Sequence, residues 1–135
     1  MTYLHGYPLY IPPKRRKPIL RERNLHKAVA DYLRLALPPS VFWTTFPSGS
    51  GGAARGGQLK AMGLRAGVPD IIMLFRGRFL AIELKAKRGW LSEAQQACQA
   101  LITGAGGTWA EARSVEDVDR IVAAFGIPLR GRVTT

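Results

Sequence analysis

Two acidic residues and a lysine interrupt an apolar stretch that reads GVPDIIMLFRGRFLAIELKAK. Asp70 follows Pro69, and Glu83 and Lys85 stand two residues apart near the end of the second apolar run. Burying an unpaired carboxylate is strongly unfavourable, and two neighbouring carboxylates repel each other. A divalent cation such as Mg²⁺ removes both costs, because it binds carboxylate oxygens together with water and phosphate. With a lysine to orient a water or stabilise charge on a phosphate, these residue types favour phosphodiester hydrolysis.

The two apolar runs predict a β-hairpin that positions these residues. Residues 70–75 and 78–85 are rich in β-forming types, and Arg76-Gly77 supplies a tight turn between them. Because side chains alternate between the faces of a strand, Glu83 and Lys85 share one face. The pairing brings Asp70 to the same end of the hairpin. The structural alternative is an exposed Glu-Lys pair on an edge strand, with Asp70 capping a turn.

The remaining sequence predicts alternating helices and strands in one α/β domain. Apolar residues recur at helical spacing from Arg21 until Pro38-Pro39. We divide the chain into an arm over 1–20, a folded domain over 21–126 and a tail over 127–135. The other expected elements are a strand over 41–46, a short helix over 58–67, a helix over 91–104 that starts at Ser92, a strand over 108–113 and a helix over 114–126.

The chain is strongly basic. Lys and Arg number 20 against 9 Asp and Glu, a formal net charge of +11, which favours a polyanionic partner such as nucleic acid. The basic, proline-containing arm carries Lys14, Arg15, Arg16 and Lys17, which we expect to contact phosphate.

No apolar run approaches the ~20 residues of a membrane span, so we expect no membrane partner. The single cysteine, Cys98, excludes an intramolecular disulfide and favours a reducing compartment.

A glycine-rich segment, PSGSGGAARGG at 47–57, resembles a phosphate-binding loop at first sight. No GK[ST] follows its glycines, and the acid expected after the next strand of a dinucleotide site is missing. We therefore expect no nucleotide cofactor. A loop that closes on DNA, with Arg55 and Lys60 at its base, is the preferred interpretation, and an unstructured connection is the alternative.

Several motifs in this order resemble the VRR-NUC domain of the PD-(D/E)XK nuclease superfamily, in its stand-alone form, over about residues 21–120. The motifs are E-x-x-L-H in the first helix (Glu22, Leu25, His26), F-P-S-G (Phe46–Gly49), GVPD (Gly67–Asp70), ELK (Glu83–Lys85) and L-S-x-x-Q (Leu91–Gln95). The resemblance implies one restriction-endonuclease-like domain, with a central mixed β-sheet of about four strands flanked by helices.

The resemblance also assigns roles to residues. Asp70 and Glu83 are implied metal ligands, joined by the backbone carbonyl of Leu84, and Lys85 is the implied catalytic lysine. Glu22 is the implied acid of the first helix, which would help to bind a second metal or a water. Two positions depart from the family pattern. His26 replaces a usual glutamine and could touch phosphate, water or Glu22, and Ser48 replaces a usual asparagine in the loop.

Two residues keep open alternatives. Gln95 either belongs to the active site or turns back to the Ser92 amide in an S-x-x-Q capping box; in the second case Gln96 would replace it. Trp90, just after the ELK strand, either stacks on a base or has a core or hinge role.

The implied activity is that of a Mg²⁺- or Mn²⁺-dependent DNA endonuclease that acts on branched DNA such as Holliday junctions, as a homodimer. It would work in the cytoplasm of a bacterium or a phage-infected host. The alternative is a basic nucleic-acid-binding domain without catalysis. The expected DNA contacts, besides the four basic residues of the arm, are His26, Ser48, Arg55, Lys60, Lys87 and Arg88.

Overall fold

The computed structural model describes residues 3–4, 7–8, 18–46, 52–86 and 89–133, with the side chains of 23–46, 56–86 and 89–133. From residue 18 onward the order of helices and strands is the predicted one, whereas two short paired strands lie in the segment that we expected to be an extended arm. The elements are β1 (Tyr3–Leu4), β2 (Tyr7–Pro8), α1 (Pro18–Ala36), β3 (Phe42–Thr45), α2 (Gly52–Ala61), β4 (Ile71–Phe75), β5 (Arg78–Leu84), α3 (Glu93–Gly104), β6 (Thr108–Ala112) and α4 (Val115–Phe125).

A mixed four-stranded sheet in the order β3-β4-β5-β6 forms the centre of the molecule. The β3–β4 and β4–β5 pairs are antiparallel, and the β5–β6 pair is parallel across α3. The β4–β5 hairpin turns at Arg76 and Gly77, which both have positive φ, 50° and 76°, as the tightest hairpin turns require. The predicted hairpin and the predicted α/β class with about four strands are therefore confirmed.

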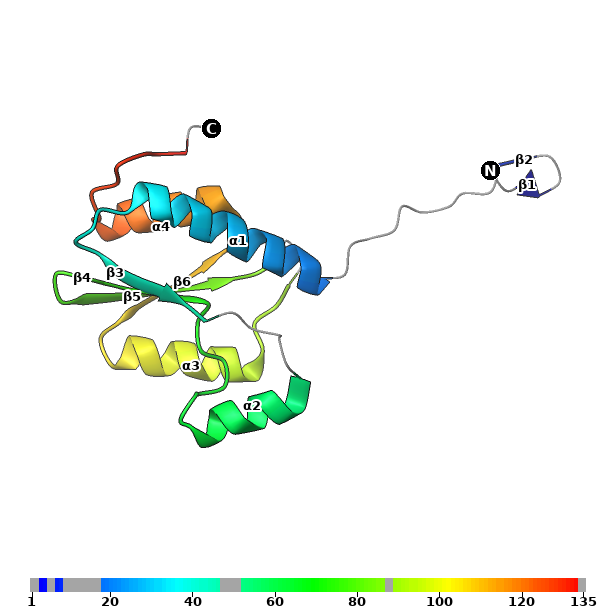
Figure 1. Ribbon diagram of the computed structural model, residues 1–135, viewed down its shortest axis with the longest axis horizontal. Helices are drawn as coiled ribbons and strands as arrows, with labels where there is room; N and C mark the ends of the chain where they lie inside the picture. The colour runs from blue at the N-terminus through cyan, green and yellow to red at the C-terminus, as the bar shows by residue number, and fades with distance from the viewer. Residues whose placement is uncertain (1–2, 5–6, 9–17, 47–51, 87–88, 134–135) are drawn as a thin grey trace.

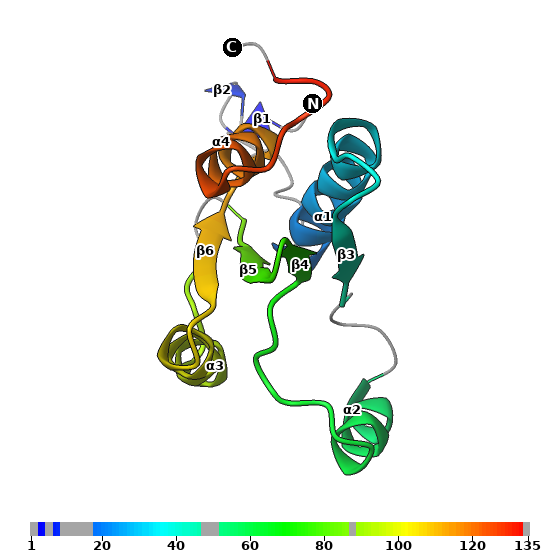
Figure 2. The same ribbon diagram turned by 90° about the vertical axis from the view of Figure 1, so that its left-hand side faces the viewer.

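Two helices, α1 and α4, pack on one face of the sheet, and α3 lies on the other side. Figure 1 shows α1 and α4 above the sheet and α3 below it, and in Figure 2 α3 lies beneath β6. The hydrophobic core fills the layer between the sheet and the α1–α4 pair. Its fully buried members include Val29 and Leu33 of α1, Ile71 and Met73 of β4, and Ile82 of β5.

The predicted position of the second helix is wrong. We expected a helix over 58–67, whereas α2 spans Gly52–Ala61 and therefore includes residues 52–57 of the glycine-rich segment. Gly63, with φ of 102°, ends it: the Gly63 amide donates to Lys60 and the Leu64 amide donates to Leu59. This is the hydrogen-bond pattern of a Schellman motif, which favours glycine at the left-handed position. The low helix propensity of glycine hid the first half of α2.

The C-terminal segment, expected as a tail, packs on the domain as far as it is described. Ile127 is 3% exposed, and the Arg130 amide donates to the Ala36 carbonyl at 2.8 Å. Asp119 of α4, itself buried, accepts hydrogen bonds from Tyr32 of α1 and from Arg132. The segment after α4 is thereby joined to both α1 and α4.

Candidate active site

Asp70 lies directly before β4, and its carboxylate faces the end of β5. The residue is 8% exposed, and its Oδ2 atom accepts a hydrogen bond from the Leu84 amide at 2.8 Å. Because Ile71 pairs with Ile82, the next position places Asp70 opposite Glu83. The hairpin thus brings the two acids together, as its predicted pairing requires.

Glu83 is a buried carboxylate with one unsatisfied oxygen. It is 3% exposed; its Oε1 atom lies 4.0 Å from Lys85 Nζ, whereas its Oε2 atom is buried without a hydrogen-bond partner among the described residues. Burial raises the pKa of Glu83 to about 8, with the charge of Asp70 adding to the shift and the charge of Lys85 opposing it. This carboxylate lacks a positive partner close enough to offset its burial.

Gln95 makes both of the contacts that we treated as alternatives: it caps α3 and it faces the acids of the candidate site. Its side-chain oxygen accepts a hydrogen bond from the Ser92 amide at 2.9 Å, and its Nε2 atom donates to Glu83 Oε1 at 2.8 Å. The Ser92 hydroxyl completes the capping box by accepting from the Gln95 amide. The expectation that the two roles exclude each other is wrong, because the amide group has an acceptor end and a donor end.

The glycine of GVPD lets the chain pass close to α3. Gly67 has φ of 77°, and a Cβ atom built on it would lie 2.3 Å from the carbonyl carbon of Ala94 and 2.6 Å from the Gln95 amide nitrogen. Any side chain at this position would separate the segment that leads to Asp70 from the helix that carries Gln95. Gly67 therefore determines how closely the two parts of the site approach.

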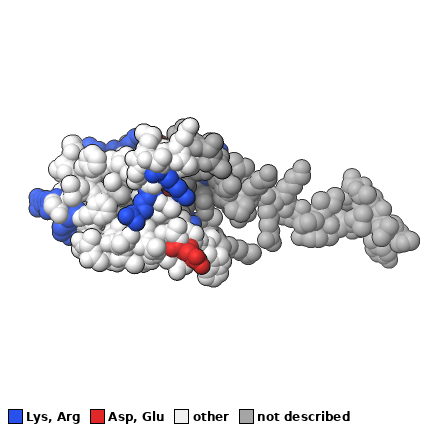
Figure 3. Space-filling model, turned by 90° about the horizontal axis from the view of Figure 1, so that it is seen from below, with Lys and Arg blue, Asp and Glu red and all other residues white. Residues whose placement is uncertain are grey.

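A cavity of about 260 Å³ opens beside the two acids. Asp70, Glu83, Ser92 and Gln95 line it together with Arg65, a cation that our sequence analysis did not single out. Arg65 stands five residues before Asp70 in the connection to β4. Figure 3 shows the side of the molecule seen from below, where several Lys and Arg side chains are visible and acidic side chains occupy one small area of this face.

An E-x-R sequence on β6 lies beside the E-x-K sequence on β5. Glu83 pairs with Glu111 in parallel register, and the Lys85 amide donates to the Ala112 carbonyl at 2.9 Å. This register places Arg113 beside Lys85. Arg113 forms an ion pair with Glu111. The guanidinium group does not meet the geometry of a hydrogen bond to Glu111 Oε1. In the sequence, the E-x-R spacing at 111–113 matches the E-x-K spacing at 83–85, and this match could have pointed to Arg113.

Arg113 binds the turn that follows the ELK strand. Its Nη1 and Nη2 atoms donate to the carbonyl oxygens of Ala86 and Gly89, each at 2.8 Å, and the Gly89 amide donates to Ala86 at 2.8 Å. A Cβ atom on Gly89 would lie 3.4 Å from Cδ of Lys85, so the turn packs against the lysine stem. Arg113 thus fixes the backbone around Lys85.

The two described carboxylates fit a divalent cation. Mg²⁺ commonly takes one or two carboxylates and completes its shell with water and phosphate. A cation would give the unpartnered Glu83 Oε2 atom a partner and relieve the repulsion from Asp70. No group of three or more His, Cys, Asp or Glu side chains converges in the part of the chain that the structure describes. The side chain of Glu22, the third predicted acid, lies outside that part, although its backbone belongs to α1.

For some of the other predicted site residues the structure describes the side chain, for others only the backbone, and for the rest neither. His26 lies on α1, and its Nε2 atom is buried without a hydrogen-bond partner among the described residues. Lys60 is exposed in the last turn of α2, and the backbone of Arg55 belongs to the same helix. The remaining predicted DNA contacts, Lys14, Arg15, Arg16, Lys17, Ser48, Lys87 and Arg88, lie outside the described residues.

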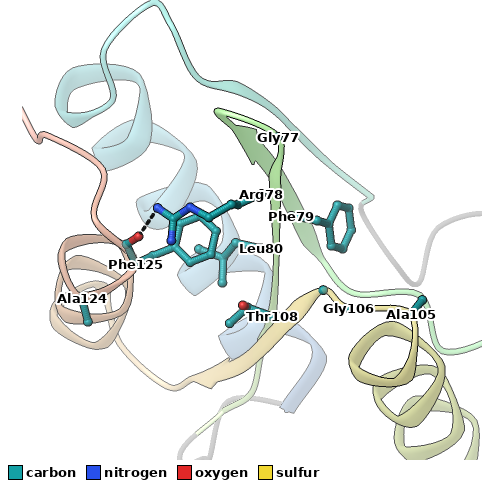
Figure 4. A pocket seen from close by; sticks show the side chains of 10 residues that line it. Gly77, Arg78, Phe79, Leu80, Ala105, Gly106, Thr108, Ala124 and Phe125 are labelled. Carbon is teal, nitrogen blue, oxygen red and sulfur yellow. Dashed lines mark hydrogen bonds between the residues drawn. The ribbon is translucent and has the colours of Figure 1, made fainter.

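A second cavity, of about 560 Å³, lies at the opposite end of β5. Arg78 is the charged residue that lines it. Figure 4 shows this side chain against the Phe125 ring, with its guanidinium carbon 4.2 Å from the ring centroid and one nitrogen donating to the Phe125 carbonyl at 2.5 Å. These contacts join β5 to the end of α4, so Arg78 has a structural role.

The fold and the paired acids define a nuclease-like α/β domain. Residues 43–116 match the model of the VRR-NUC domain family, and the chain belongs to that family, a family of nucleases. A solved structure described as "VRR_NUC domain protein" has a TM-score of 0.64 at 18% identity, over 78% of this chain and 88% of that one; at this identity the likeness concerns the fold. No curated protein matches the chain.

The matched range begins at β3, so Glu22 and His26 of α1 lie before it. Their roles remain predictions. None of the helices that the structure describes is long and apolar enough to cross a membrane.

Proposed function

We propose that this VRR-NUC protein is a Mg²⁺- or Mn²⁺-dependent DNA endonuclease, and that Asp70 and Glu83 hold its metal. The unpartnered oxygen of Glu83 beside a second carboxylate carries the proposal. Burying two carboxyl groups side by side is costly to the fold, because at neutral pH one of them must take up a proton. Such a pair is expected where a cation compensates for it.

Asp70, Glu83, the carbonyl of Leu84 and Glu22 would hold the cation, which supplies an acidic, metal-bound water and charge stabilisation when bound. Gln95 holds Glu83 Oε1 in a fixed orientation through its 2.8 Å hydrogen bond. Lys85 is 8% exposed beside this carboxylate. In this position it orients the attacking water or stabilises negative charge on the phosphate. Arg65, at the cavity wall, binds a phosphate of the DNA strand.

We further propose branched DNA, such as a Holliday junction, as the substrate of a homodimer. A two-fold dimer presents two symmetry-related sites, which suits paired cuts in two strands. The net charge of +11 supports a DNA partner, and the free Cys98 suits the reducing cytoplasm of a bacterium or a phage-infected host. The predicted arm would add phosphate contacts through Lys14–Lys17.

A DNA-binding domain without catalysis is the alternative. It would explain the positive charge equally well. It would not explain Asp70 and Glu83 in one cavity with Arg65, because acids near a phosphate-binding surface weaken binding unless a cation bridges them.

Cleavage of labelled four-way junction, flap, nicked and linear duplex DNA tests the proposal. Each substrate is incubated with Mg²⁺, Mn²⁺ or EDTA and with the native protein or Glu83→Gln, which keeps the side-chain shape. Glu93→Gln, exposed on α3, is the matched control. We expect cutting that requires metal, is lost in Glu83→Gln and is retained in Glu93→Gln. Tight DNA binding without cutting, unchanged by Glu83→Gln, would leave the binding-domain alternative.

A further inference from the structure

Trp90 is an exposed aromatic residue in the connection between β5 and α3. It is 87% exposed, so the core role left open by the sequence is wrong. Single exposed apolar residues are common on protein surfaces and do not by themselves mark a site. The position of Trp90 and the way its backbone is held distinguish it.

The chain places Trp90 between two parts of the candidate active site. It follows Gly89, which packs against the Lys85 stem, and it precedes Ser92 by two residues. Ser92 lines the cavity that contains Asp70 and Glu83. Because consecutive Cα atoms are about 3.8 Å apart, the Trp90 backbone lies within roughly 8 Å of Ser92. The backbone that carries the exposed indole therefore lies close to the wall of that cavity.

The backbone before Trp90 is fixed on both sides of a turn. Arg113 donates to Ala86 and to Gly89, and the Gly89 amide closes the turn onto Ala86. Arg113 is itself held by its ion pair with Glu111 and by the hydrogen bond from its amide to Asp117 Oδ2 at 2.8 Å. On the other side, the capping box at Ser92 fixes the start of α3. An aromatic ring on such a support binds a flat partner without a large ordering cost.

We propose that Trp90 is a stacking platform for an accessible base of the DNA substrate, next to the phosphate that is cut. The inference rests on the proposed nuclease function, because that function supplies the partner. Bases inside a continuous duplex are covered by their neighbours, whereas a branch point, a flap or a single strand offers a free base face. Base–aromatic stacking is tolerant of sequence, so Trp90 selects DNA structure rather than sequence.

Binding in EDTA tests the inference without requiring cleavage. The probe is a forked oligonucleotide with 2-aminopurine in its unpaired arm, and a fully paired duplex serves for comparison. The proteins are native, Trp90→Phe, Trp90→Ala and Leu101→Ala, the last an exposed residue of α3 as a control. Fluorescence quenching and anisotropy give the stacking signal and the dissociation constant, and circular dichroism verifies the fold of each variant.

We expect Trp90→Ala to weaken binding of the forked probe by about 5- to 150-fold, the equivalent of about 1–3 kcal/mol of stacking, with loss of quenching. Trp90→Phe should retain most of both signals, and neither change should affect the paired duplex. Equal loss on fork and duplex, or no loss on the fork, would overturn the inference. Stacking through Trp90 without cleavage would instead contradict the proposed function, so the two failures are distinguishable.

Discussion

The side chain of Gln95 joins the start of α3 to the acid on β5, because its Nε2 atom lies 2.8 Å from Glu83 Oε1 while its Oε1 atom accepts from the Ser92 amide. The same residue caps a helix and orients a candidate metal ligand. Folding of α3 and preparation of the site are therefore coupled through one amide group.

Gln95→Glu separates these two functions. Glutamate at this position keeps the acceptor for the Ser92 amide, so the capping box should persist. It removes the donor to Glu83 and adds a third negative charge. We expect cleavage activity to fall by about 10- to 100-fold, the usual effect of losing a group that orients a metal ligand.

Ser92→Ala is the reciprocal control for this prediction. It removes the hydroxyl acceptor of the cap and should cost about 1 kcal/mol of stability, while the hydrogen bond from Gln95 to Glu83 remains. Calorimetric melting and initial cleavage rates of both variants check the separation. An equal loss of cleavage rate in the two variants would contradict it.

Glu83→Gln should stabilise the protein in the absence of divalent metal. At neutral pH the change removes the cost of protonating Glu83 on folding, a cost that arises from its burial and from the charge of Asp70. Mg²⁺ or Mn²⁺ should raise the melting temperature of the native protein, because a ligand that binds the folded state stabilises it. Melting curves of native protein, Glu83→Gln and Glu93→Gln in EDTA and in each metal provide the measurement.

The metal-dependent rise should disappear in Glu83→Gln and persist in Glu93→Gln. A rise of equal size in all three proteins would place cation binding elsewhere in the chain.

Gly67→Ala should destabilise the protein more than Gly77→Ala does. Both glycines have nearly the same φ, 77° and 76°, so both changes carry the left-handed penalty of about 1–2 kcal/mol. A Cβ atom at Gly77 meets nothing within 4 Å, whereas at Gly67 it meets the Ala94 backbone at 2.3 Å. We expect an additional loss of about 1–3 kcal/mol at Gly67 from overpacking. Urea denaturation of the two variants measures the difference.

The β4–β5 hairpin could be predicted because its signals are local. The two apolar runs alternate around a turn pair at Arg76-Gly77, and this fixes the register that brings Asp70 opposite Glu83. The first half of α2 could not be predicted, since its glycines disfavour a helix in isolation. Gly63 carried a helix-ending signal that we read as part of the helix instead.

The contribution of Arg113 was not predictable for a different reason. Its position beside Lys85 depends on the parallel pairing of β5 with β6, which α3 separates in the sequence. Parallel strands joined through a helix have no local turn that sets their register. The spacing of Glu111 and Arg113 is visible in the sequence, but their place beside Glu83 and Lys85 appears only in three dimensions.

Arg113→Met should lower kcat more than it changes KM. The thioether cannot bind the carbonyl groups of Ala86 and Gly89 together, so the turn against the Lys85 stem loses its support. Small displacements of a catalytic group can cost up to about 100-fold in rate. Single-turnover cleavage of a junction substrate measures the effect.

Arg120→Met is the matched control for Arg113→Met, because Arg120 is an exposed arginine of α4 that pairs with Asp117. It should leave kcat unchanged. Arg113→Lys should fail to restore the rate, since one ammonium group does not reproduce the two-armed geometry of the guanidinium. Full activity of Arg113→Met would exclude a positioning role.

The buried Asp119 should make the stability of the protein depend on acid pH. Burial by itself would raise the pKa of this carboxyl group, but hydrogen bonds from Tyr32, Arg132 and the Val133 amide outweigh burial and hold the pKa below its usual 3.8. A group whose pKa is lower in the folded state stabilises the fold above its unfolded pKa. That contribution is lost as the pH falls through the folded value.

Asp119→Asn keeps the shape of the side chain and removes the titration. At pH 7 it should cost about 1–3 kcal/mol, because a charge-assisted hydrogen-bond network is replaced by a neutral one. The difference in unfolding free energy between native protein and variant should shrink below pH 4. Denaturant titrations at pH 7, 5 and 3 measure it; a difference that stays constant over this range would show that Asp119 does not contribute through its charge.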